Sequence, residues 1–124
     1  MEQAGISVLR TNECEVVDLD WGELRWHASG SLGNSGEMTL GTARLKPGQA
    51  NPRHYHPNCS EVLVVVSGGI SHTLDAGETA ELGPGDTVTI PEGVPHKARN
   101  LSETEEAVLF IAFSSADRQT VMEE

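Results

Sequence analysis

The segment Gly48-Gln-Ala-Asn-Pro-Arg-His54-Tyr-His56-Pro-Asn-Cys-Ser-Glu61 carries two histidines two positions apart and a carboxylate five positions later. In an extended strand, residues i and i+2 point to the same face, roughly 6.5 Å apart. His54 and His56 can therefore project together from one strand. Two imidazoles and a carboxylate that converge form a plausible site for a divalent transition metal. We expect the rest of the chain to hold and complete this site.

Short apolar segments lie on both sides of this stretch, and most of them end at a turn that contains glycine or proline. The run at 62–66 consists only of valine and leucine, which we interpret as a strand buried on both faces. Short strands at roughly ten-residue spacing predict an all-β sandwich or barrel. Further strands are expected at 6–10, 15–19, 24–28, 38–45, 70–74, 79–82, 87–90 and 106–113.

The two ends of the chain show no such pattern. Residues 1–5 are expected to be a frayed terminus, and the polar tail 114–124 is expected to be a short helix or disordered. No segment has a helical period of useful length, and no repeat or change of composition marks a domain boundary. A chain of 124 residues is therefore expected to form one domain.

The composition argues against two classes of partner. The net charge is -11, with only eight lysines and arginines, so nucleic-acid backbones and anionic membrane surfaces would be repelled. No stretch approaches the roughly 20 apolar residues of a membrane span, and the N-terminus lacks the basic and apolar pattern of a signal peptide. Two cysteines, Cys14 and Cys59, without a CxxC motif favour a reduced, cytoplasmic protein.

Two spaced motifs in the chain resemble those of the cupin superfamily. The motifs are Gly48-x5-His54-x-His56-x4-Glu61-x6-Gly68 and Gly85-x5-Pro91-x-Gly93-x2-His96-x3-Asn100. Both match without a departure, and the short spacer between them, residues 69–84, is typical of small cupins. The resemblance covers residues 48–100 directly, and the flanking predicted strands fit a cupin barrel on both sides.

The resemblance implies one cupin domain over residues 1–124, with its motifs at 48–68 and 85–100. The implied fold is a jelly-roll barrel (a double-stranded β-helix) with a metal in its mouth. Many small cupins pair through an edge strand or exchange terminal segments, so a homodimer is expected. The ligands carried over from the family are His54, His56, Glu61 and His96.

Three neutral imidazoles and one carboxylate would suit Zn, Fe, Mn, Ni, Co or Cu as the divalent ion, and residue type alone does not choose among these metals. A five- or six-coordinate ion would keep one or two positions open for water, dioxygen or a small-molecule substrate. Gly93 is expected to take a positive φ in the loop that delivers His96.

His72 is the candidate catalytic residue outside the ligand set. It lies on the strand predicted after Gly69 and could act as a general base, a hydrogen-bond partner of a ligand or a fifth ligand. The alternative is an outward or hydrogen-bonded strand histidine with no such role.

Other polar and aromatic residues near the motifs are weaker candidates. Arg44 and Arg53 could bind an anionic group of a substrate, although Arg44 could simply end an exposed strand. Cys59 is interpreted as structural because nothing argues for a partner base or an exposed thiolate. Three further residues are assigned structural or rim positions: His27, Trp21 and Trp26.

Three functions are compatible with these residues. The first is a Lewis-acid cyclase, isomerase or lyase that acts on an oxygen-rich carbonyl substrate. It is favoured by a finer resemblance to small cupins linked to ring closure of aromatic polyketides, which rests on 52–59, 61–63 and 114–118. The second is a dioxygenase that uses Fe(II) or another redox metal. The third is a non-catalytic metabolite-binding cupin.

Overall fold

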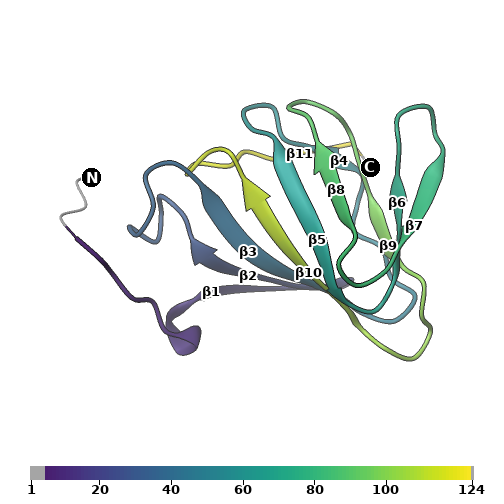
Figure 1. Ribbon diagram of the computed structural model, residues 1–124, viewed down its shortest axis with the longest axis horizontal. Helices are drawn as coiled ribbons and strands as arrows, with labels where there is room; N and C mark the ends of the chain where they lie inside the picture. Colours follow the sequence, from purple (N-terminus) through teal and green to yellow (C-terminus); the bar gives the residue numbers. More distant parts are fainter. Residues whose placement is uncertain (1–4, 124) are drawn as a thin grey trace.

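The computed structural model describes residues 5–123 and is built almost entirely of antiparallel strands (Figure 1). Its largest sheet has the order β1-β2-β3-β10-β5-β8, a second has the order β7-β6-β9, and β11 pairs with β4. A single 3-10 turn, Thr11–Glu13, precedes the first strand. The strands are β1 (Glu15–Leu19), β2 (Gly22–Ala28), β3 (Thr39–Leu45), β4 (His54–Tyr55), β5 (Glu61–Ser67), β6 (Ile70–Thr73), β7 (Thr79–Leu82), β8 (Thr87–Ile90), β9 (Ala98–Asn100), β10 (Ala107–Phe113) and β11 (Val121–Met122).

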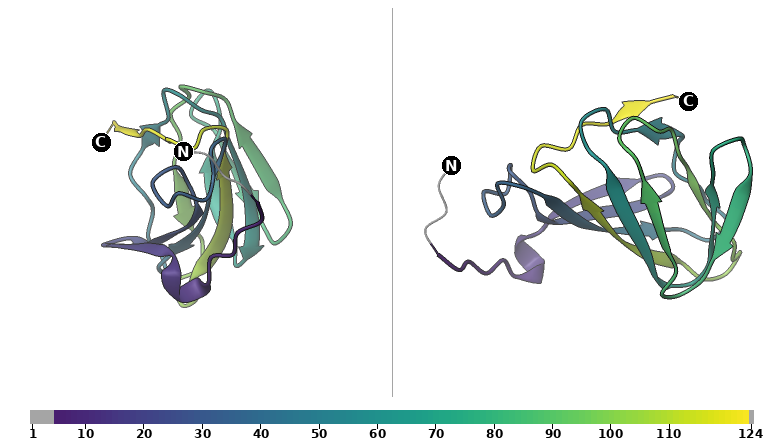
Figure 2. Two further views of the ribbon diagram at one scale, coloured as in Figure 1. Left: turned by 90° about the vertical axis from the view of Figure 1, so that its left-hand side faces the viewer. Right: turned by 45° about the horizontal axis from the view of Figure 1, so that its top comes forward.

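The two larger sheets curve around a shared interior, which is the jelly-roll arrangement (Figures 1 and 2). In β10, every second residue from Ala107 to Phe113 is buried, because alternate side chains of a strand point to opposite faces. Ile70 of β6 and Ala98 of β9 join the same buried cluster from the opposite sheet. The sequence prediction of an all-β jelly roll is therefore confirmed.

The interpretation of 62–66 as a strand buried on both faces is wrong. The strand itself is present, but burial alternates along β5, and Val62 and Val66 are 46% and 42% exposed. Their side chains lie on the outer face of the six-stranded sheet, where no other element of residues 5–123 covers them. An apolar run alone could not reveal this, because it is equally compatible with a second layer.

The predicted strand at 6–10 and the prediction for the tail at 114–124 need correction. Residues 6–10 form no strand, and Ile6 is fully exposed on an extended arm that leaves the barrel (Figure 2). The tail is neither helical nor irregular throughout: Val121 pairs with Tyr55 and Met122 with His54. The expectation of a frayed terminus concerns residues that lie mostly outside the described range.

Residues of the two motifs that are not ligands form the framework of the barrel. Gly93 has φ +80, as its place in the second motif predicts, and its N–H donates to the carbonyl of His56. A side chain at Gly68 (φ +82) would also meet the backbone of Ala107 at 3.0 Å. The buried Asn100 donates from Nδ2 to the carbonyls of Leu45, Lys46 and Glu105 and accepts from the N–H of Ser102.

Within residues 5–123, no helix has the length and apolar character that crossing a bilayer requires.

Candidate metal centre

Two of the histidines are brought together by backbone pairing. The N–H of His54 donates to the carbonyl of His96 at 3.1 Å, and the N–H of His96 donates back to the carbonyl of His54 at 2.8 Å. The rings lie with centroids 4.4 Å apart. The loop that contains Gly93 therefore places His96, which lies 35 residues beyond Glu61 in the sequence, directly against the first motif.

Each of the three histidines contacts a backbone carbonyl through Nδ1. The partners are the carbonyls of Pro52 for His54 (2.7 Å), Gln119 for His56 (2.9 Å) and Val94 for His96 (2.9 Å). Because a carbonyl oxygen only accepts, Nδ1 carries the proton in each ring. Each Nε2 is then left with its lone pair free for a metal, which is the arrangement typical of metal-ligating histidines.

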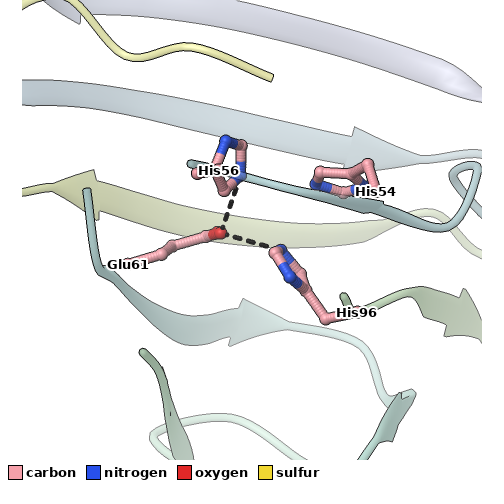
Figure 3. A group of neighbouring side chains, drawn as sticks. All are labelled: His54, His56, Glu61 and His96. Carbon is pink, nitrogen blue, oxygen red and sulfur yellow. Dashed lines mark hydrogen bonds and ion pairs between the residues drawn. The ribbon is translucent and has the colours of Figure 1, made fainter. Parts of the chain in front are cut away.

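Glu61 lies opposite these nitrogens (Figure 3). One of its oxygens is 3.0 Å from Nε2 of His96 and 3.3 Å from Nε2 of His56. Potential ligand atoms of His54, His56, Glu61 and His96 all lie within 4.8 Å of one another. With the three rings neutral, these groups are all acceptors, so a shared proton or a cation is needed between them. The donor set therefore fits a divalent transition metal.

The electrostatics of the cluster follow from burial and close contact. Burial lowers the pKa of His54 to about 4, against the opposing effect of its contact with Pro52. Burial alone would raise the pKa of Glu61, but without a metal its contacts with His56 and His96, across which a proton is shared, lower it to about 2. Burial also opposes protonation of His96, yet its contact with Glu61 raises the pKa of His96 overall. Glu61 is therefore ionised at neutral pH, as a metal ligand must be.

The four residues line one side of a cavity of about 490 Å³ inside the barrel. Most of the remaining wall is apolar and comes from β1, β2, β3, β5 and β10. A cavity of this size is in the range of sites for small organic molecules. Its apolar walls include Val17, Leu19, Trp21, Leu24, Trp26, Ala43, Leu45, Leu63, Leu109, Ile111 and Phe113.

His72 also lines this cavity and is only 1% exposed. Its ring is stacked on that of His96, with centroids 5.8 Å apart and planes at 18°. Nδ1 lies 2.8 Å from the carbonyl of Thr73 and so carries the proton, while Nε2 is buried without a hydrogen-bond partner. His72 is therefore not an outward-facing strand residue.

The two arginines suggested by the sequence lie outside the cavity. Arg44 forms an exposed ion pair with Glu106 at 2.7 Å, and Arg53 pairs with Glu123 at 3.3 Å. The arginine that does line the cavity is Arg118, in the tail. Sequence reasoning missed it because no strand pattern places it, and only the quoted ending 114–118 pointed to this region.

The tail also supports one of the candidate ligands. The carbonyl of Gln119 fixes the ring of His56, and Asn58 holds the tail by accepting from the N–H of Gln119 (3.0 Å) and donating to the carbonyl of Asp117 (2.8 Å). We call residues 114–123 the C-terminal strap, because they cross beside the first motif and end in β11.

The remaining residues singled out from the sequence serve in packing or in hydrogen bonds away from the candidate ligands. Cys59 is buried, and burial raises the pKa of its thiol, as expected of an unreactive cysteine. His27 lies away from the cavity, with Nε2 2.7 Å from the hydroxyl of Thr42 and Nδ1 3.3 Å from the sulfur of Cys14. Trp26 packs in the core, and Trp21 packs against it, although both also face the cavity.

The chain is thus a small jelly-roll barrel in whose interior three histidines and a glutamate form a candidate metal centre. A protein-family model described as "Cupin domain" matches residues 41–113. The chain belongs to the cupin family.

Sequence relatives include germin-like proteins and oxalate oxidases. Germin-like protein 3-5 of Oryza sativa subsp. japonica is 33% identical over 111 residues, which is 84% of this chain and 46% of that protein. Oxalate oxidase 1 of Hordeum vulgare is 32% identical over 111 residues, which is 84% of this chain and 52% of that protein. The chain spans about half the length of these relatives.

Solved structures share the fold at lower identity. The polyketide cyclase RemF from Streptomyces resistomycificus superimposes with a TM-score of 0.78 at 18% identity, over 97% of this chain and 87% of RemF. A mutant of Bacillus subtilis oxalate decarboxylase OxdC gives a TM-score of 0.81 at 23% identity, over 92% of this chain and 31% of that one. Similar proteins thus include named enzymes of several reaction types.

Proposed function

We propose that His54, His56, Glu61 and His96 bind one divalent transition metal and that the chain is a metal-dependent enzyme acting on a small organic molecule. The observation that carries the proposal is the convergence of three Nε2 lone pairs and one carboxylate at a cavity wall. Zn, Fe, Mn, Ni, Co and Cu all accept such a donor set. All four ligands lie on strands or next to them, which favours a stiff site.

The reaction we propose is a cyclisation, isomerisation or lyase reaction of an oxygen-rich carbonyl compound, such as ring closure of a polyketide. A divalent metal at this site supplies Lewis acidity that polarises a carbonyl. The cavity supports this assignment, because about 490 Å³ with mostly apolar walls suits a ring-bearing substrate. The shared fold and near-complete mutual coverage with RemF are consistent with it.

Within this proposal His72 is the general base. Its Nε2 has no partner in the described structure and belongs to a side chain that lines the cavity. It would accept a proton from the carbon next to the polarised carbonyl, while Nδ1–H stays bonded to Thr73 and keeps the ring in place. The apolar walls would hold the substrate rings and exclude water.

A deuterium-exchange experiment tests this assignment. 2-Acetylnaphthalene, an aryl methyl ketone, is incubated in D₂O without oxygen with the metal-loaded protein, and exchange of its methyl protons is followed by NMR. We expect exchange that requires metal, and we expect His72→Gln to retain metal but lose most of the exchange. No exchange above the protein-free rate, or undiminished exchange in His72→Gln, would contradict the proposed chemistry.

The second candidate is oxidative chemistry with a redox metal, favoured by the identity of 32% to an oxalate oxidase over 84% of the chain. Oxalate offers the discriminating test, because that relative is named for it. The purified protein is reconstituted with Mn(II) or Fe(II) and given oxalate in air. Oxygen consumption and peroxide formation would favour this candidate, whereas we expect neither, since oxalate is small and doubly charged and the cavity is large and apolar.

We further propose that the chain forms a homodimer. Apolar side chains on the outer face of the six-stranded sheet are exposed, among them Val62, Val66 and Phe110, and a second copy would cover them. Sedimentation equilibrium tests this: the wild type should be dimeric and Phe110→Lys shifted toward monomer. A wild type that is monomeric throughout the micromolar range would exclude the dimer.

A further inference from the structure

Arg118 lies on the wall between two cavities. Its guanidinium carbon is 4.3 Å from the centre of the Trp26 ring and 5.4 Å from that of Phe113. Trp26 and Arg118 line both the large cavity with the candidate metal centre and a smaller, more polar one of about 230 Å³. The cation is therefore held in place by aromatic stacking.

No carboxylate of residues 5–123 forms an ion pair with Arg118. Its Nη1 donates to the hydroxyl of Thr120 at 2.6 Å, while its Nε is buried without a hydrogen-bond partner. By contrast, Arg25, Arg44 and Arg53 each pair with a glutamate. Glu15 and Asp117 line the smaller cavity without pairing with Arg118, and the charges of Glu15 and Glu61 act on Arg118 only from beyond ion-pair distance.

A largely buried cation without a counter-ion is costly unless a ligand supplies the opposite charge. The large cavity offers a place for that ligand, since Arg118 lines it and Glu61, a candidate metal ligand, is the one carboxylate among the described residues that line it. A molecule that filled it would contact both the candidate metal centre and Arg118, which both line this cavity. The fork of an arginine binds the two oxygens of a carboxylate with particular strength.

We infer that Arg118 binds an anionic oxygen group of the substrate, so that the substrate is a largely apolar, ring-bearing molecule with one acidic group, such as a carboxylate. This inference deepens the proposed function and rests on it for the identity of the cavity as the substrate site. Arg118 thereby fixes the orientation of the substrate relative to the candidate metal centre.

The test compares 2-naphthoate with its neutral counterpart 2-naphthamide. Their dissociation constants are measured by calorimetry on metal-free and metal-loaded protein. We expect the metal-free wild type to prefer naphthoate, and Arg118→Met to weaken naphthoate binding by at least about tenfold while leaving naphthamide binding unchanged. Arg44→Met is the matched control, since it removes the same charge from outside the cavity, and it should change neither constant.

Metal content and the unfolding midpoint are recorded for every variant. If Arg118→Met does not fold, Arg118→Gln replaces it, because a glutamine amide can still donate toward Thr120. Equal affinity of the wild type for both probes, or a naphthoate preference that survives in a folded neutral variant, would overturn the inference. The measurements on metal-free protein separate this inference from the proposed function. If metal-free Arg118→Met folds and has lost the preference for naphthoate, the role of Arg118 is supported even if the metal-loaded protein shows no catalysis.

Discussion

The two cupin motifs and the C-terminal strap contribute to one site in different ways. The motifs supply all four candidate ligands together with the turns that aim them. The strap supplies no ligand, yet its backbone orients His56 and its Arg118 lines the cavity. Ligand identity is thus encoded locally by spacing, whereas ligand orientation and the proposed substrate recognition depend on a segment about 60 residues away.

The largest effect is expected from removal of a ligand in the motifs. His96→Ala should lower metal affinity by more than about 100-fold, because loss of residues that only support ligands already costs 10–100-fold. Metal content by elemental analysis and affinity by competition with a chelator measure this. His27→Ala is the control, since His27 lies outside the cavity; if both variants lost metal equally, or neither did, the ligand assignment would be wrong.

A smaller effect is expected from a change at Asn100, the residue of the second motif whose side chain binds backbone carbonyls. Asn100→Ala leaves the carbonyls of Leu45, Lys46 and Glu105 without their amide donor, which should lower the free energy of unfolding by about 2 kcal/mol. Urea denaturation measures the loss. Metal bound per folded chain should stay at the wild-type level, and a selective loss of metal without loss of stability would refute a framework role.

Loosening the strap should have a still smaller effect, and only on the affinity for metal. Asn58→Ala removes both hydrogen bonds that fix Asp117 and Gln119, so His56 loses its firm orientation and metal affinity should fall by about tenfold. Asn34→Ala is the matched control, because Asn34 makes two similar bonds to the backbone of His27 and Ser29. Equal metal affinity in the two variants would show that the strap does not support the site.

The smallest effect concerns the cysteine beneath the strap. Cys59 is buried and Cys14 is partly exposed, so a thiol reagent should modify Cys14 first. Asn58→Ala should then raise the modification rate of Cys59 by about two- to threefold, because strap opening exposes it. Mass spectrometry of the labelled sites follows both rates, and a Cys59 rate unaffected by Asn58→Ala would mean that the strap does not control its access.

The sequence motifs predicted which four side chains converge, and the role of these side chains as metal ligands stays a prediction. The positions of His54, His56, Glu61 and His96 follow from motifs whose glycines and prolines allow few backbone paths, and Gly93 has the positive φ expected of it. Most strands were found because alternation and turn residues are local signals, whereas the short strands β9 and β11 were not predicted.

Sequence reasoning failed where long-range packing determines the position of a residue. Arg118 reaches the cavity only because Trp26 and Phe113 hold its guanidinium, and no local pattern in the strap indicates this. The outward face of 62–66 and the arm at 6–10, which forms no strand, were misread for the same reason, since an apolar strand pattern does not say whether a partner strand or layer exists. The expectation of a single domain over 1–124 and that of a cytoplasmic location stay predictions.

The central claim is that three imidazoles and one carboxylate of this chain bind a single metal ion. Elemental analysis combined with X-ray absorption spectroscopy of the purified protein tests it most directly. We predict one divalent transition metal per chain, with three histidine nitrogens and a carboxylate oxygen at about 2.0–2.2 Å. Failure to bind any of the six candidate metals after reconstitution, or a coordination shell without histidine, would contradict the account.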